Sequence, residues 1–190
     1  MKVTAVAPAN IAFIKYWGKA DDALRLPLNS SISMNLSACI TTTTVEFSRS
    51  YGEDSVDFLD QEALTGLSRP LQDCRSESLR VCKHLDNMRA RAGSRLHARV
   101  VTKNSFPKGA GIASSASAFA ALTVAAAAAL QLTLSEKELS LLARLGSGSA
   151  CRSIPDGFVE WLKGKSSQTS YAYSLYPHDH WDLRDIVVVV

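Results

Sequence analysis

The chain has 190 residues, of which 46% are hydrophobic, and a formal net charge of +3. This length and composition suit one large domain with a buried core, while the small, scattered charge argues against nucleic acid as a partner. The four cysteines show no Cys-x-x-Cys spacing, and the first residues lack the apolar core of a signal peptide. We therefore expect a cytoplasmic protein with free thiols and no zinc site, and we interpret His178-Asp179-His180 as a solvated loop.

The first fifty residues favour strands. Residues 2–7 alternate polar and apolar side chains and predict a first strand, which we expect to stop at Pro8. The second half of residues 28–37 alternates in the same way, and the β-branched run 41–47 predicts a further strand. Three neighbouring strands of this kind indicate a mostly antiparallel sheet.

Between these strands lies an unusual segment, residues 10–19, in which polar and aromatic side chains interleave with apolar ones. One interpretation is an amphipathic turn whose lysines are solvated. The other is an anion clamp, with Lys15 and Lys19 supplying point charges and Tyr16 a hydroxyl donor. The residues alone leave both interpretations open.

The middle of the chain predicts a polar hairpin or excursion over 54–69, a helix over 76–92 and a strand over 96–102. The strand leads into Asn104-Ser-Phe-Pro-Lys-Gly-Ala-Gly-Ile-Ala-Ser-Ser115, where Pro107 should end it. Gly109 and Gly111 permit a tight turn, Ser114 and Ser115 are candidate N-caps, and the alanine-rich run 116–130 predicts a helix.

A helix that starts after a glycine loop offers free N–H groups and a positive dipole end to an anion such as phosphate. The loop has neither the Gly-Lys-Ser/Thr ending of a Walker loop nor the Gly-x-Gly-x-x-Gly of a dinucleotide site. A tight turn before a packed helix remains the alternative. The uncharged stretch 109–135 is long enough to span a bilayer, but its alanine content argues against membrane insertion.

The last third begins with Ser135-Glu-Lys-Glu138, which predicts a capped helix that ends at Gly146. A second small-residue loop, 146–153, follows. Its Ser147, Ser149 and Arg152 could donate to an anion, although a plain flexible connection is the alternative. Residues 157–161 and 186–190 predict strands, and because the chain stops inside the second we expect the natural sequence to continue.

Three runs in this order resemble the diphosphomevalonate decarboxylase family of the GHMP kinase superfamily. They are Ala7-Pro-Ala-Asn-Ile-Ala-Phe-Ile-Lys-Tyr-Trp-Gly-Lys19, Phe106-Pro-Lys-Gly-Ala-Gly-Ile-Ala-Ser-Ser-Ala116 and Gly146-Ser-Gly-Ser-Ala-Cys-Arg-Ser153. The resemblance covers the N-terminal half of the family's length. It implies that residues 1–190 form an α+β GHMP-kinase N-terminal domain, ribosomal protein S5 domain 2-like, which binds ATP and substrate and ends before a C-terminal domain. Its mainly antiparallel sheet should carry helices on one face.

The family converts 5-diphosphomevalonate and ATP to isopentenyl diphosphate, ADP, phosphate and carbon dioxide. The resemblance implies Lys15 and Arg152 as catalytic residues, Arg152 on the substrate carboxylate and Lys15 on the transferring phosphoryl group. The implied substrate-binding residues are Asn10, Tyr16, Trp17, Lys19, Ser147, Gly148, Ser149 and Arg152. The implied ATP-binding residues are Asn104, Lys108, Gly109, Ala110, Gly111, Ile112, Ala113, Ser114 and Ser115, with Ser115 also near Mg²⁺. A homodimer of the full-length protein, without membrane or nucleic-acid partners, is expected on the same ground.

Two departures from the family pattern matter. Asp156-Gly157, preceded by Pro155, stands where the family has two glycines, so that turn should differ in shape. The family's catalytic aspartate lies in an Asp-Ala-Gly-Pro-Asn type motif that these residues lack, and the context of Asp156 does not match it. The alternatives are therefore a phosphomevalonate decarboxylase, a mevalonate 3-kinase-like sibling, or a non-catalytic nucleotide-binding fragment.

Overall fold

The computed structural model describes residues 1–59, 71–107, 112 and 114–186. Its strands are β1 (Lys2–Ile14), β2 (Lys19–Asp21), β3 (Leu26–Pro27), β4 (Ser31–Ser48), β5 (Ser55–Phe58), β6 (His97–Asn104), β7 (Phe158–Trp161) and β8 (Ala172–Tyr176). Its helices are α2 (Leu71–Ala92), α3 (Ser114–Ala129) and α4 (Glu136–Gly146), with short 3₁₀ helices η1 (Gly148–Ser153) and η2 (Ser167–Thr169).

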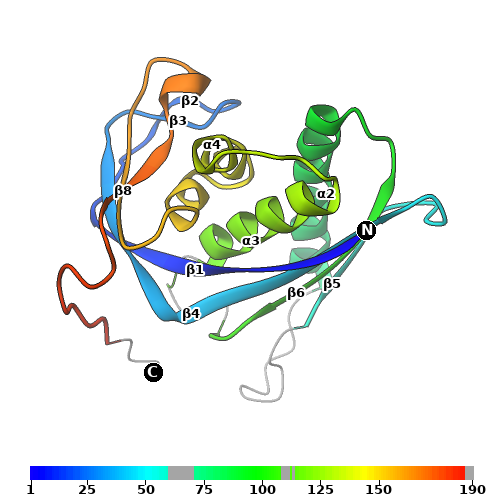
Figure 1. The fold of residues 1–190 in the computed structure, drawn as a ribbon, viewed down its shortest axis with the longest axis horizontal. Coiled ribbons are helices and arrows are strands. Elements are labelled where there is room, and N and C mark those ends of the chain that lie inside the picture. The colour runs from blue at the N-terminus through cyan, green and yellow to red at the C-terminus, as the bar shows by residue number, and fades with distance from the viewer. Residues whose placement is uncertain (60–70, 108–111, 113, 187–190) are drawn as a thin grey trace.

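One six-stranded sheet organises the molecule, with strand order β5-β6-β4-β7-β8 and β1 paired to β4. Every pair in it is antiparallel except β5 with β6. The helices α2, α3 and α4 lie together on one face of this sheet (Figure 1). The predicted fold class, a mainly antiparallel sheet with helices on one face, is confirmed.

The predicted end of the first strand at Pro8 is wrong, because β1 continues to Ile14. Proline is tolerated here because β1 pairs only with β4 and its register shifts directly after Pro8, where Pro8 opposes Ile40 but Ala9 opposes Leu36. The two strands predicted over 28–37 and 41–47 are parts of a single long strand, β4. The first part of the segment 10–19 is therefore strand and not turn.

The other elements follow the sequence with some omissions. Helices α2 and α4 and strands β6 and β7 are confirmed, while β2, β3 and β8 were not predicted. The segment 54–69 contains β5, and its residues 60–69 lie outside the described part of the chain. Of the strand expected over 186–190, residues 187–190 also lie outside the described part, and Ile186 is not in a strand.

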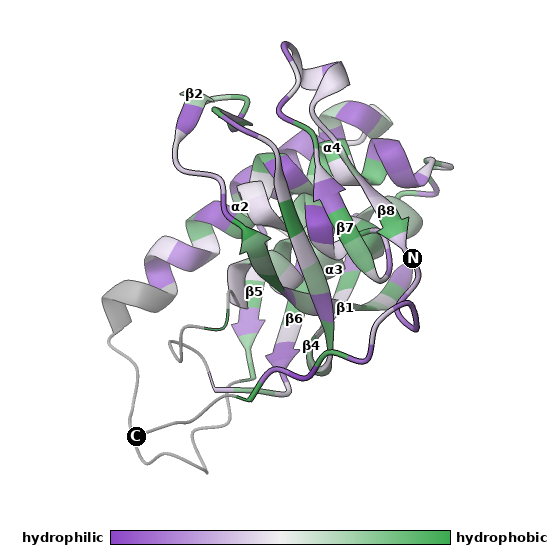
Figure 2. Cartoon of the chain, turned by 90° about the vertical axis from the view of Figure 1, so that its left-hand side faces the viewer, coloured by the Kyte–Doolittle hydropathy of each residue, from purple (hydrophilic) through white to green (hydrophobic). Residues whose placement is uncertain are grey.

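Helix α3 forms the centre of the core. Eleven of its residues are buried, most of them alanines, because small side chains let the helix lie close to the sheet and to its neighbours. Figure 2 shows mixed hydrophilic and hydrophobic residues along α2 and α4, the helices that flank it. None of the described helices combines the length and apolarity needed to cross a bilayer.

Candidate functional site

A cleft lies at the N-terminal end of α3, with about 540 Å³ of open space including solvent at its mouth. Cationic, amide and hydroxyl groups and the carboxylate of Glu77 share its wall with apolar side chains. The lining residues are Phe58, Glu77, Arg80, Val81, Thr102, Lys103, Asn104, Ser114, Ser115, Ala118 and Phe119. A helix start with hydroxyls and two cations nearby suits a phosphate, and the apolar wall suits a flat ring.

The structure places several of the predicted ATP-binding residues. Ser114 and Ser115 line the cleft, but they are the first two residues of α3 and not its N-cap as predicted, because the helix begins at Ser114, two residues before the expected start at position 116. Ile112 is buried among core residues beside Phe106 and does not line the cleft. Residues Lys108, Gly109, Ala110, Gly111 and Ala113 lie outside the described part of the chain.

Asn104 also lines the cleft, and a chain of hydrogen bonds joins it to α3. Thr41 Oγ1 lies 2.7 Å from Asn104 Oδ1, to which it donates, and 2.6 Å from Ser117 Oγ. Because Oδ1 accepts this bond, the amide nitrogen is the group of Asn104 that remains to face a ligand. Its predicted position beside the nucleotide base stays a prediction.

The second predicted loop, residues 146–153, is not a flexible connection. It forms the 3₁₀ helix η1, whose residues Gly148, Ala150, Cys151, Arg152 and Ser153 are buried. Asn10 on β1 holds it in place, because its Nδ2 donates to Ser149 O at 3.1 Å and to Ser153 Oγ at 2.8 Å. Because nearly all residues of η1 are buried against the core, this segment is ordered and is not an open loop.

Arg152 lies at the centre of this second region, with only 4% of its surface exposed. Its Nη1 donates to Ser31 Oγ at 2.6 Å, its Nη2 to Asn10 Oδ1 at 3.2 Å, and its Nε to Ser33 Oγ and Asn10 Oδ1. Within the described part of the chain no carboxylate pairs with it, and each terminal nitrogen has one N–H to spare. Burial lowers the pKa of Arg152, yet arginine keeps its charge in proteins.

A buried cation without an acidic partner is costly, so the site favours an anion that supplies the missing charge. The two serines that accept from Arg152 were not predicted. Ser31 and Ser33 are two positions apart on β4 and both are buried, so they point to the same face of the sheet. Ser31 and Ser33 could have been recognised from the sequence as small polar residues at two inward-facing positions of a strand.

Tyr16 and Gly148 meet beside Arg152. The Tyr16 ring lies edge-on to the Trp161 ring with centroids 4.9 Å apart. A Cβ at position 148 would lie 3.1 Å from the Trp161 ring and 3.2 Å from Tyr16 Oη, so any larger residue there would press on both side chains. Ser147 Oγ lies 3.2 Å from Ser115 Oγ, and this contact joins the second region to the cleft.

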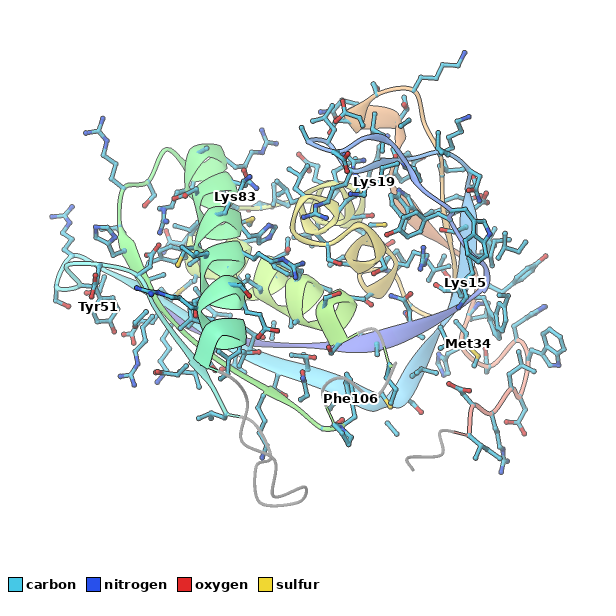
Figure 3. The ribbon with its side chains drawn as sticks, turned by 180° about the vertical axis from the view of Figure 1, so that it is seen from behind. Lys15, Lys19, Met34, Tyr51, Lys83 and Phe106 are labelled. Carbon is cyan, nitrogen blue, oxygen red and sulfur yellow. The ribbon has the colours of Figure 1, made fainter. Side chains whose placement is uncertain are left out.

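The remaining predicted residues are at the surface. Lys15 and Lys19 are exposed and lie at the end of the molecule opposite Tyr51 (Figure 3). Lys19 forms an ion pair with Asp22, and the Trp17 side chain is 82% exposed. Asn29 orders this loop by donating to Lys15 O and accepting from Trp17 N. No hydrogen bond among the described residues joins either lysine to Arg152.

The turn that departs from the family pattern also needs its glycine. Gly157 has φ +78°, and a Cβ there would lie 2.3 Å from Tyr176 O. Asp156 beside it is exposed, and its Oδ2 lies 3.1 Å from His178 Nδ1, so it faces solvent and not Arg152. In the described ranges no three His, Cys, Asp or Glu side chains gather as metal ligands would.

Comparisons with known proteins agree with this geometry. The sequence model of the "diphosphomevalonate decarboxylase-like N-terminal domain" matches residues 7–172. Diphosphomevalonate decarboxylase of Bos taurus is 40% identical over 199 residues, which cover 99% of this chain and 48% of that protein. The Candida albicans diphosphomevalonate decarboxylase is 41% identical, with 98% of this chain and 53% of that protein covered. The chain thus spans about half the length of the curated relatives it matches.

Solved structures give the same result. Mevalonate diphosphate decarboxylase from Enterococcus faecalis superposes with a TM-score of 0.81 at 44% identity, covering 95% of this chain and 53% of that one. A structure of "MDDEF in complex with MVAPP, AMPPCP and Magnesium" has a TM-score of 0.78 at 45% identity and covers 90% of this chain and 50% of that one. The chain belongs to the diphosphomevalonate decarboxylase-like N-terminal domain family.

Proposed function

We propose that this chain is the N-terminal, ATP- and substrate-binding domain of an enzyme that decarboxylates 5-diphosphomevalonate with ATP. The observation that carries the proposal is Arg152, a buried guanidinium whose acceptors are all neutral and which has N–H groups to spare. A carboxylate is the anion whose planar shape matches that fork. The family relationship indicates which substrate carries this carboxylate, namely 5-diphosphomevalonate.

The cleft beside α3 is the proposed ATP site. Ser114, Ser115 and the helix start would receive the phosphates, with Lys103 and Arg80 as nearby cations and Asn104 towards the base. Ser115 would supply one oxygen to Mg²⁺, which commonly keeps water and phosphate oxygens as its other ligands. When bound, the ion would neutralise charge on the phosphates. The hydroxyls, the cations and the helix dipole of the cleft fit the phosphates of an ATP–Mg²⁺ complex.

The region around η1 is the proposed substrate site. Arg152 would hold the carboxylate, while Ser147, Gly148, Ser149, Tyr16 and Lys19 would hold the diphosphate, with Asn10 and Trp17 alongside. Lys15 would stabilise charge on the transferring phosphoryl group. The 3.2 Å contact between Ser115 Oγ and Ser147 Oγ supports this division, because it brings the two sets of residues against each other.

In the proposed reaction ATP phosphorylates the 3-hydroxyl, the phosphate leaves, and carbon dioxide is lost as the double bond forms. Arg152 holds the carboxylate until that bond breaks. The family's aspartate motif is not in these 190 residues, and Asp156 faces solvent beside His178. General acid–base help of this kind is worth roughly 10²–10⁴ in rate. The domain alone should therefore bind both ligands and release little or no carbon dioxide.

The test is calorimetric titration of the 190-residue chain with mevalonate 5-diphosphate, mevalonate 5-phosphate and mevalonate, with and without ATP and Mg²⁺. Tightest binding of the diphosphate, with ATP-dependent carbon dioxide release near background, is the expected result. Tighter binding of the monophosphate would favour a phosphomevalonate enzyme instead. Failure of all three to bind would overturn the proposal, and rapid carbon dioxide release would return attention to Asp156.

A further inference from the structure

The β2–β3 hairpin is fastened to the C-terminal end of α4 by two reciprocal hydrogen bonds. Arg25 on the hairpin donates from Nε to Leu145 O on the helix, at 2.9 Å. Arg144 on the helix donates from Nε to Leu24 O on the hairpin, at 3.0 Å. Each partner thus gives one arginine and one backbone carbonyl, and we call these four residues the arginine clamp.

Arg144 cannot leave its place at low cost, because it is fully buried. Its Nη1 donates to the carbonyl oxygens of Ser167 and Ser170, and its Nη2 donates to Ser167 Oγ at 2.7 Å. No carboxylate among the described residues pairs with it, so backbone carbonyls alone balance most of its donors. A buried guanidinium held in this way fixes the hairpin, α4 and η2 relative to one another.

The hairpin also carries a sign of constraint. Arg25 has φ +51°, in the left-handed region that non-glycine residues seldom occupy. Leu24 N donates to Asp21 Oδ1 at 2.8 Å, which closes the turn around this residue. A strained residue persists only where its surroundings hold it, and here the Leu145 carbonyl does so.

The clamp lies between two parts of the proposed substrate site. Lys19 begins β2, where it pairs with Pro27 on β3. Gly146 ends α4, directly after the clamp, and Ser147 and η1 follow it. The clamp therefore sets where Lys19 lies relative to Ser147, Ser149 and Arg152.

We propose that Arg25 and Arg144 are positioning residues that hold Lys19 in register with η1 for the substrate diphosphate. This inference rests on the proposed function, since it assigns Lys19 to that ligand. Neither arginine touches the cleft beside α3, so the clamp should leave ATP binding unchanged. A change that loosens the hairpin should weaken binding of the substrate alone.

The experiment compares Arg25→Ala with Arg25→Lys and with a matched control, Arg99→Ala. Arg25 is chosen because it is only half-buried, whereas loss of the fully buried Arg144 could prevent folding. Arg99 is an exposed arginine that pairs with Asp57, far along the sheet. Hydrogen–deuterium exchange reports on the hairpin, and calorimetry reports on mevalonate 5-diphosphate and on ATP with Mg²⁺.

In Arg25→Ala we expect amide exchange over 19–27 to rise at least tenfold and affinity for mevalonate 5-diphosphate to fall about tenfold, with ATP affinity unchanged. Arg25→Lys should restore part of the amide protection and part of the substrate affinity, because lysine can still donate to Leu145 O. Arg99→Ala should change neither the exchange over 19–27 nor the affinity for mevalonate 5-diphosphate.

Unchanged exchange over 19–27 would overturn the clamp whatever the ligand results. Raised exchange with unchanged substrate affinity would overturn the positioning role and leave the proposed function standing. A wild-type chain that binds no mevalonate 5-diphosphate would overturn the proposed function, and the positioning role with it.

Discussion

The two segments rich in serine and glycine, residues 105–115 and 146–153, have similar compositions and opposite settings. The first leads into α3 beside an open cleft, whose walls include Ser114 and Ser115. The second is the buried helix η1, with β1, β4 and α3 packed around it. Composition alone predicted an anion site in both segments. The packing around each segment decides which of its groups can contact an anion.

In the cleft those groups are helix N–H groups, hydroxyls and the exposed cations Arg80 and Lys103, which suit a ligand that stays in contact with water. Around η1 the main group is a single buried guanidinium, Arg152, held by neutral side chains. Water screens the first set and hardly reaches the second. A charge in the second region should therefore contribute more to binding than any one group in the first.

The largest expected effect is that of Arg152→Ala. The variant removes charge-assisted hydrogen bonds, each worth about 1.5–3 kcal/mol, so affinity for mevalonate 5-diphosphate should fall at least about 100-fold. ATP affinity should stay within about threefold of wild type. Arg152→Lys should recover little, because an ammonium cannot replace the fork. Calorimetry checks both ligands, and equal losses for ATP and substrate would contradict the separation of the two regions.

Gly146→Ala tests the point at which the two regions touch. A Cβ there would lie 2.2 Å from Phe119 Cδ1, and Phe119 lines the cleft. Overpacking of this kind costs about 1–3 kcal/mol of stability, and we expect the upper end. Both ligands should bind more weakly. Gly52→Ala is the control, because its Cβ would meet nothing within 4 Å. Urea unfolding that shows equal stability for the two variants would refute the close approach.

His84 lies between the two regions and makes their packing sensitive to pH. Burial, together with the charge of Arg25, lowers the pKa of His84 from 6.5 to about 4. Its Nε2 lies 2.8 Å from Thr123 Oγ1, and its Nδ1 has no partner among the described residues. Because the unfolded state binds the proton more readily below pH 6.5, stability falls as the pH drops towards 4.

At pH 5 this effect should amount to about 2 kcal/mol relative to pH 7.5. Urea unfolding of wild type and His84→Gln at both pH values isolates it, since the carboxylates titrate equally in both proteins. The wild-type protein should lose about 2 kcal/mol more than the variant. Identical losses would mean that His84 is not held neutral in the fold.

Elements with local sequence signals were predicted correctly. Predictions were wrong or absent where contacts between residues far apart in the sequence determine the structure. The capping box of Ser135 and Glu138 is present as expected, because both groups lie within one turn. Pro8 misled because nothing local shows that β1 is paired on one side only. Ser31 and Ser33 looked like ordinary strand residues until η1 brought Arg152 against them. Arg144 gave no signal at all, since most of its acceptors are backbone carbonyls that lie far from it in the sequence.

The most direct test is a cross-titration, in which Ser115→Ala and Arg152→Ala are each titrated with ATP–Mg²⁺ and with mevalonate 5-diphosphate. Loss of the Ser115 hydroxyl should weaken ATP by about 1–3 kcal/mol, and loss of the Arg152 guanidinium should chiefly weaken the diphosphate. Each variant should change the other ligand far less. If Ser115→Ala left ATP affinity unchanged, or if Arg152→Ala left diphosphate affinity unchanged, the assignment of two binding regions to these residues would be wrong.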